Sequence, residues 1–309
     1  NYIGGSGGTV RIGYGVGPFL GLSVALQAPS FSNSGVYINP TGVLNAASFA
    51  PFTAGVSPGE LITIVGNNIG PSTLQVTQTV PFPTKLGGVQ VLINQIPAPL
   101  YYVSANQVSA IVPFEISSAS VAQIQIVNNG SSSNVVTEFI NQTTPGIFTE
   151  PAGGVGEAAA LHPDFSLVTA NHPAQIGETV AVFVTGLGNT FPFVSDGAAA
   201  PSTNLANTTA TITATVDNIP ATVTFAGLAP GLAGLYQVNV VIPSGVTPGD
   251  VYLELIGPDS DTLEAGIPVG SSGLDVKGRA KTVQPQRKST QGHLPVRPLP
   301  LAAPPELHP

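Results

Sequence analysis

Alternating polar and apolar residues recur in short runs along the chain. The run TATITATV at residues 209–216 places Thr at every other position and Ala, Ile or Val between them. AQIQIV at 122–127, YQVNVVI at 236–242 and VYLEL at 251–255 alternate in the same way. A half-buried β-strand has this period of two, and no segment combines a helical period with capping residues. The pattern therefore predicts an all-β fold.

Three sequence blocks occur twice, in the same order. GELITIVGNNIG at 59–70 returns as GETVAVFVTGLG at 177–188, NQIPA at 94–98 as DNIPA at 217–221, and QVSAIVP at 107–113 as QVNVVIP at 237–243. The extra residues of the second copy fall in the Gly-rich run FAGLAPGLAGLY, where an insertion leaves strand register intact. A repeat of about 110 residues is the size of an immunoglobulin-like sandwich. We expect tandem immunoglobulin-like β-sandwiches, each with a "QV…P" central strand that its Pro terminates.

The repeat sets the expected domain boundaries. The first immunoglobulin-like domain should occupy residues 41–148 and the second residues 149–270. Residues 1–40 have the pattern of the C-terminal strands of a preceding β-domain. Residues 271–309 form a basic, Pro-rich tail, which we expect to be a disordered or aberrant extension.

Composition and charge exclude several classes of protein. The chain has 42% hydrophobic and 8% charged residues, with 36 Gly, 30 Pro and no Cys, Met or Trp. Residues 1–270 carry two basic side chains against fourteen acidic ones, which argues against nucleic-acid binding. No apolar run approaches the roughly 20 residues of a membrane-spanning helix. The neutral polar surface suits an extracellular protein, and the start at Asn1 indicates a fragment or processed product.

Longer segments carry a family resemblance. They are GVLNAASFAPFTAGVSPGELITIVGNNIG, LGGVQVLINQIPAPLYYVSANQVSAIVPFEI, PGIF and FAGLAPGLAGLYQVNVVIPSGVTPGDVYLEL. Together they resemble the uncharacterised C-terminal domain of secreted acidobacterial (Solibacter-type) proteins, which is similar to tandem immunoglobulin-like modules of the IPT/TIG type. The resemblance covers about residues 41–268 and implies an extracellular or bacterial cell-surface location. It supplies no catalytic residue and no ligand, and the tail departs from it.

One segment gathers several candidate metal ligands. They are Glu157, His162, Asp164, His172 and Glu178. A catalytic zinc needs about three such side chains converging on one point. Both histidines precede a Pro across a predicted hairpin, where solvated turn residues are the commoner outcome. No nucleophile or oxyanion motif accompanies them, so we expect no enzymatic activity; a hydrolase would have to build its site at this hairpin.

Other candidate sites involve carboxylates and aromatic rings. Asp259 and Asp261 could contribute to a calcium shell, but their spacing lacks a full EF-hand loop and an Asp-rich hairpin turn is the favoured interpretation. We expect no cofactor, with calcium at these carboxylates as the alternative. Tyr101, Tyr102 and Tyr236 could stack on sugars or pack at an interface, and alternation requires one of the first two to face the core.

These observations favour a non-enzymatic, secreted or cell-surface structural or adhesive module. Its expected partners are other copies of itself or other surface proteins. Exposed strand edges with almost no Lys to block them predict edge-to-edge or head-to-tail self-association. The alternative is a carbohydrate-binding accessory module that attaches a secreted enzyme to polysaccharide.

Overall fold

The structure is a computed structural model that describes residues 9–10, 24–25, 35–50, 55–262 and 265–270. Strands β1 (Thr9–Val10) and β2 (Val24–Ala25) form an antiparallel pair within a separate unit, Asn1–Ser34. The predicted preceding domain and the predicted tail lie largely outside the described residues. Within the described part of the chain, no helix is long and apolar enough to cross a membrane.

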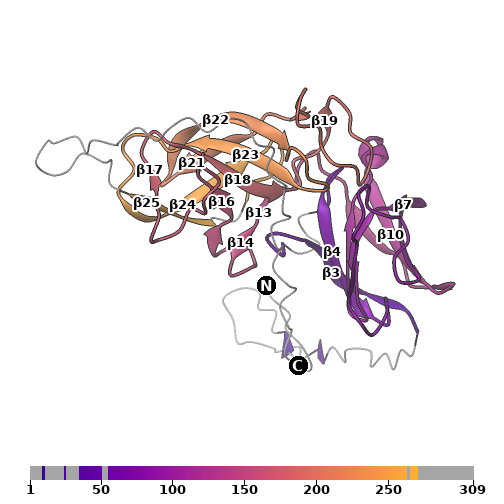
Figure 1. Ribbon diagram of the computed structural model, residues 1–309. Helices are drawn as coiled ribbons and strands as arrows, with labels where there is room; N and C mark the ends of the chain where they lie inside the picture. The colour runs from indigo at the N-terminus through magenta and orange to yellow at the C-terminus, as the bar shows by residue number, and fades with distance from the viewer. Residues whose placement is uncertain (1–8, 11–23, 26–34, 51–54, 263–264, 271–309) are drawn as a thin grey trace, which may run out of the picture. The chain divides into compact units, whose positions relative to one another are not determined.

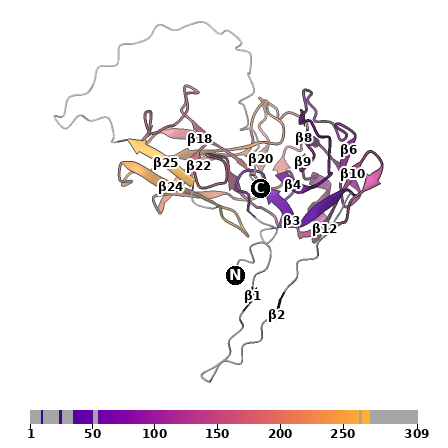
Figure 2. The same ribbon diagram turned by 90° about the horizontal axis from the view of Figure 1, so that it is seen from below.

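The first sandwich has two sheets (Figure 1). One has the order β3, β4, β9, β8, β5, with bounds Tyr37–Asn45, Leu61–Asn67, Gln107–Ile111, Leu100–Val103 and Gln75–Val76. The other has the order β11, β10, β6, β7, with β12 on β10 and bounds Ser131–Ser132, Val121–Asn128, Val89–Ile93, Ile96–Ala98 and Val136–Phe139. The two inner faces bury an apolar core, and β12 lies beside β3 (Figure 2).

The second sandwich repeats this plan. One sheet contains β13, β18, β23 and β22, with β16 on β18, and their bounds are Gly146–Ile147, Thr179–Thr185, Tyr236–Val241, Ile219–Leu228 and Ala160–Leu161. The other contains β21, β24, β25, β15 and β14, with β17 on β25, and their bounds are Thr213–Val216, Gly249–Ile256, Ala265–Gly270, Glu157–Ala158, Thr149–Glu150 and Ala174–Gln175. A hairpin of β19 (Thr190–Phe191) and β20 (Asn207–Thr208) attaches to β22. The predicted all-β fold of tandem immunoglobulin-like sandwiches is confirmed.

The duplication is preserved in the strand register. Across β4 and β9, Leu61 pairs with Ile111. The residues that occupy these places in the second copy, Thr179 and Val241, pair in the same way across β18 and β23. Each "QV…P" strand lies in the interior of its sheet. Because a slip of one residue would turn every side chain to the opposite face, this shared register fixes the same core positions in both copies.

The two copies differ where a proline interrupts one of them. Pro99 separates β7 from β8 in the first sandwich. Thr222 takes its place in β22, which pairs with β21 at its start and with β23 along the rest. Proline has no N–H for the ladder, whereas the continuous strand β22 changes partner between Ala221 and Thr222, just before a register shift between Val223 and Phe225.

The strands also extend past the expected domain boundaries. β3 begins at Tyr37, before residue 41, because its first residues pair with the end of β4. β13 begins at Gly146, before residue 149, because it pairs with β18 of the second sandwich.

Each copy closes one hairpin with the same two-residue turn. Asn94 and Gln95 have φ values of 51° and 67°, and Asp217 and Asn218 have values of 54° and 59°. Two consecutive left-handed residues define a type I′ turn, the geometry that matches the twist of the flanking strands. Asn and Asp tolerate this conformation, whereas Gln95 is less suited to it.

We predict that Gln95→Gly stabilises the protein. Gly removes the energetic cost of holding a non-Gly residue in the left-handed conformation of the folded state. This gain exceeds the cost of the conformational entropy that Gly adds to the unfolded chain, so the free energy of unfolding should rise by about 0.5 kcal/mol. Urea denaturation would measure it. As the matched control, Gln123→Gly in strand β10 should lower the free energy of unfolding by about 0.5–1 kcal/mol. A loss of stability in Gln95→Gly would contradict the prediction.

Candidate functional site

A buried carboxyl group joins the two sandwiches. Glu60 has no exposed surface, and it ends the turn that leads into β4. Its Oε2 accepts hydrogen bonds from the Ser57 N–H at 2.7 Å and from the Thr144 hydroxyl at 2.5 Å. Its Oε1 accepts a hydrogen bond from Asn45 Nδ2 at 2.9 Å. These three donors satisfy a group whose burial would otherwise be costly.

Thr144 lies in the linker between the sandwiches and extends this network in both directions. Its carbonyl accepts a second hydrogen bond from Asn45 Nδ2 at 2.9 Å, and its N–H donates to Gly186 O at 2.8 Å. Beside it, the Leu61 N–H donates to Thr185 Oγ1 at 2.7 Å. The start of β4 in the first sandwich is therefore bonded to the end of β18 in the second.

Tyr236 packs under the same junction. Its side chain is fully buried, and its hydroxyl donates to Gly188 O at 2.6 Å and lies 3.4 Å from Pro58 O. Gly59 has a φ of 75°, and a Cβ there would collide with the Tyr236 hydroxyl and the Phe114 ring. Glycine at this position therefore permits the close approach of the two sandwiches. Burial raises the pKa of Tyr236 above its ordinary value.

Phe114 extends from the first sandwich into the core of the second. It begins a short 3₁₀ helix (η2, Phe114–Ser118), and its ring meets Phe193 edge to face at 6.1 Å between centroids. Its N–H donates to Asp196 Oδ1 at 3.2 Å. Burial, followed by the neighbouring Glu115 carboxyl, raises the pKa of Asp196 to about 7.

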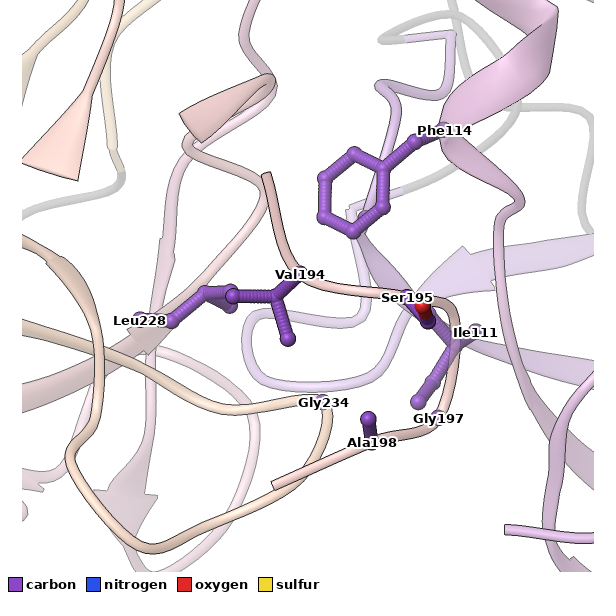
Figure 3. Close-up of a pocket in the computed structure, with 9 residues that line it drawn as sticks. Ile111, Phe114, Val194, Ser195, Gly197, Ala198, Leu228 and Gly234 are labelled. Atoms are coloured by element: carbon purple, nitrogen blue, oxygen red, sulfur yellow. The ribbon is translucent and has the colours of Figure 1, made fainter. Parts of the chain in front are cut away.

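The described residues of the junction leave a small pocket between them. A pocket of about 10 Å³, roughly the space of one water molecule, lies between the sandwiches (Figure 3). Its lining residues are Gly59, Ile111, Phe114, Val194, Ser195, Gly197, Ala198, Leu228 and Gly234. A shallow surface groove of about 340 Å³ lies beside β25, lined by Glu150, Pro151, Val155, Gly156, Glu157, Asp250, Gly266, Ile267 and Pro268.

The candidate calcium ligand Asp259 binds the linker instead. Its carboxylate accepts hydrogen bonds from Gln142 N at 2.7 Å and from Thr143 N and Oγ1 at 3.1 and 2.9 Å. Asp261 makes no side-chain hydrogen bond to the residues that the structure describes. The two carboxylates have separate environments, and Asp259 fixes the linker from the side of the second sandwich.

The candidate ligands near His162 form a compact hydrogen-bonded group. His162 is buried, with its Nδ1 at 2.7 Å from Glu178 Oε1 and its Nε2 at 3.0 Å from His172 O. Its ring stacks on His172 at 4.0 Å. Burial alone would lower the pKa of His162, but the hydrogen bonds to Glu178 and the His172 carbonyl raise it overall.

Of the two remaining candidates in this segment, Asp164 borders this group through Ser166, whose Oγ lies 3.3 Å from His172 Nδ1. Asp164 accepts hydrogen bonds from the Ser166 N–H and hydroxyl, and these bonds lower the pKa of Asp164. Glu157 lies on β15, opposite Gly266. In the described ranges, no three His, Cys, Asp or Glu side chains are grouped as a metal site requires.

The two adjacent tyrosines do not alternate between core and solvent. Tyr101 and Tyr102 are both half-buried, because the β8–β9 register shifts between Leu100 and Tyr102. The Tyr101 ring stacks on Phe82 at 5.7 Å and meets Tyr102 edge to face at 5.7 Å. Burial raises the pKa of both tyrosines. The expectation that one of them faces the core was wrong, since the bulge breaks the period of two.

Sequence reasoning overlooked Glu60, Asn45 and Thr144. The one available signal was the Gly-Glu pair that opens the first repeated block in both copies, as Glu60 and Glu178. A charged residue after a turn is ordinarily solvated, and the partners of Glu60 are up to 84 positions away in the chain.

Comparisons with known proteins concern the fold. No protein-family model matches the chain, and no curated protein matches its sequence. Among solved structures, the I9–I11 tandem of titin aligns over 77% of this chain and 66% of its own, with 9% identity and a TM-score of 0.20. Domains 5–6 of the S-layer protein SbsC align over 77% and 99%, with 11% identity and a TM-score of 0.21. A polysaccharide lyase aligns over 77% and 26%, with 10% identity and a TM-score of 0.21. We take no function from these likenesses.

We predict that the protein loses stability as the pH rises from about 4.5 to about 8. Burial raises the pKa of Glu60 from 4.5 to about 8, against its hydrogen bonds to Thr144, Ser57 and Asn45, which lower it. Between these values the unfolded chain has released the proton that the folded chain retains, so the free energy of unfolding falls as pH rises. Burial also raises the pKa of Glu138 and Asp196 to about 7, which acts in the same direction.

Glu60→Gln should reduce this dependence, because an amide does not titrate, and should leave the smaller part that Glu138 and Asp196 contribute. Urea denaturation across the pH range would measure the slope for the wild type and the variant. The matched control is Glu254→Gln on β24, away from the junction, which should keep the wild-type slope. Equal slopes for wild type and Glu60→Gln would contradict the prediction.

Proposed function

We propose that this protein is a non-enzymatic structural module that holds two immunoglobulin-like sandwiches in a fixed relation. The observation that carries the proposal is the junction, where Glu60, Thr144 and Asp259 bond the linker to both sandwiches. Phe114 adds an apolar anchor from one core into the other. Inter-domain interfaces without such bonding usually permit relative motion, so a junction of this kind suits a rigid spacer.

The proposed location is extracellular or the bacterial cell surface. The low content of charged residues and the resemblance to secreted acidobacterial domains support it. The proposed partners are other copies of the chain or other surface proteins. Electron microscopy of the protein from its native source tests this role: regular assemblies would support it, whereas dispersed particles retained on polysaccharide would overturn it.

The aromatic group around Tyr101 is the feature that favours the alternative, a carbohydrate-binding accessory module. Phe82, Tyr101 and Tyr102 lie together on one side of the first sandwich. Phe82 already stacks on one face of Tyr101, which leaves less ring surface for a sugar. A glycan array in which Tyr101→Ala and Tyr102→Ala remove binding would establish the alternative.

We predict that the two sandwiches unfold in one transition and that Asp259→Ala weakens their coupling. The variant removes three hydrogen bonds to a charged but exposed acceptor, so the free energy of unfolding should fall by about 1 kcal/mol. Differential scanning calorimetry would show a lower transition temperature and a broadened or split transition.

The matched control is Asp261→Ala, in the same loop, which should change the free energy of unfolding by no more than about 0.5 kcal/mol. Two separate transitions in the wild type, or equal effects of the two variants, would contradict a rigid junction.

A further inference from the structure

The turn after β3 contacts the second sandwich. Ser48 is buried there, and a Cβ on Gly154 would lie 2.8 Å from its Cα. Phe49 approaches Gly153, where a Cβ would lie 3.7 Å from the Phe ring. Together with the Glu60 network, residues 45–50 and 57–60 form the end of the first sandwich that seats on its neighbour. We call this surface the docking end.

The second sandwich builds the same end at the corresponding positions. Glu178 takes the place of Glu60, and its Oε2 accepts the Gln175 N–H at 2.8 Å, as Glu60 accepts the Ser57 N–H. His162 takes the place of Asn45 and bonds to Oε1 of the glutamate at 2.7 Å. Residues 162–167 and 175–178 therefore form a second docking end.

The repeat includes an unusual phenylalanine. Phe49 and Phe165 have left-handed φ values of 53° and 67°. The Phe49 N–H donates to Asn45 O at 2.9 Å, and the Phe165 N–H donates to His162 O at 2.9 Å. A bulky side chain rarely adopts this conformation, and such residues cluster at functional contacts.

The two docking ends differ in what covers them. Around the first end, Ser48 and Glu60 are buried by the junction. On the second, Phe165 is 83% exposed and Leu167 is 54% exposed. No described residue covers these two apolar side chains, whereas Phe49, the counterpart of Phe165, lies beside Gly153 of the second sandwich.

The receiving surface is duplicated as well. In the second sandwich, the corner at residues 185–188 accepts the first sandwich: Thr185 Oγ1 bonds the Leu61 N–H, and Gly186 O bonds the Thr144 N–H. All four residues of this corner are buried.

The matching corner of the first sandwich is residues 67–70. Asn68 has a left-handed φ of 54°, as Gly186 has one of 79°, and Ile69 is fully buried, as Leu187 is. In contrast to their counterparts, Asn67 and Asn68 are exposed. The Asn67 amide oxygen could accept a hydrogen bond as the Thr185 hydroxyl does.

Among the residues that the structure describes, one docking end and one corner thus remain exposed, and each is the counterpart of a surface used in the junction. We propose that the docking end of the second sandwich binds the corner of the first sandwich in a second copy of this chain. This inference rests on the proposed structural function and identifies the surfaces through which two copies contact each other. The contact is head to tail, so each added copy leaves a new end and a new corner, and the product is a chain of copies or a closed ring.

Sedimentation velocity of the full chain over a wide concentration range tests this inference. The wild type should show a sedimentation coefficient that rises with concentration. Phe165→Asp should weaken self-association by about tenfold or more, because it places a charge in the centre of the contact. Asn67→Lys should do the same from the opposite surface.

The matched control is Phe191→Asp. Phe191 is 75% exposed and lies on β19, whereas β17, beside the second docking end, lies at the other end of this sandwich (Figure 1). This variant should associate as the wild type does. Circular dichroism and thermal melts would establish that each variant is folded.

Mixing the two defective variants gives the sharpest outcome. Phe165→Asp retains its corner and Asn67→Lys retains its docking end, so a mixture should form dimers and nothing larger, while each variant alone stays monomeric. A monomeric wild type, association that survives both substitutions, or a mixture without dimers would overturn the inference. Each of these results leaves the single unfolding transition intact, whereas failure of the proposed function would appear as two transitions.

Discussion

The buried carboxyl group of Glu60 is the constraint on which the junction depends. A carboxyl with no exposed surface is tolerated only when its oxygens are hydrogen-bonded, and the donors come from β3, from the turn before β4 and from the linker. The linker donor, Thr144, is itself bonded to Gly186 of the second sandwich. A second sandwich that moved away would displace Thr144, which is one of the donors to Glu60, so folding of the first sandwich and placement of the second are coupled.

Glu178, the counterpart of Glu60, makes the same turn hydrogen bond in a different environment. Glu178 retains the turn N–H as a donor but is bonded to the His162 imidazole in place of the Asn45 amide. An imidazole can carry a charge, and the Glu178 side chain is 17% exposed. In the first copy, the carboxyl of Glu60 is bonded by neutral donors inside the junction. In the second copy, the carboxyl of Glu178 is bonded by a titratable donor, the His162 imidazole, at the exposed end.

Much of the fold could be predicted from the sequence, because strands and repeats are local patterns. Alternation located β10, β21, β23 and β24, and the repeated blocks implied the register that the two copies share. The candidate site could not be predicted, because its contacts join distant segments. Asp259 resembled a calcium ligand until its partner Thr143 was placed beside it, 116 positions earlier in the chain. The orientation of Tyr101 and Tyr102 depends on a β-bulge, and an alternating sequence pattern does not reveal such a bulge.

The same structure separates two routes of self-association. Strand edges in the first sandwich are poor templates: β5 and β11 have two residues each, β7 has three, and a register shift interrupts β3. Short or bulged edge strands protect a sheet from edge-to-edge pairing, as edge lysines do in other proteins. By contrast, the docking end of the first sandwich already contacts the corner of the second sandwich within the chain, through the hydrogen bonds of the junction. The proposed contact between copies therefore involves the sandwich ends, which have a bonded precedent within the chain, and not the strand edges.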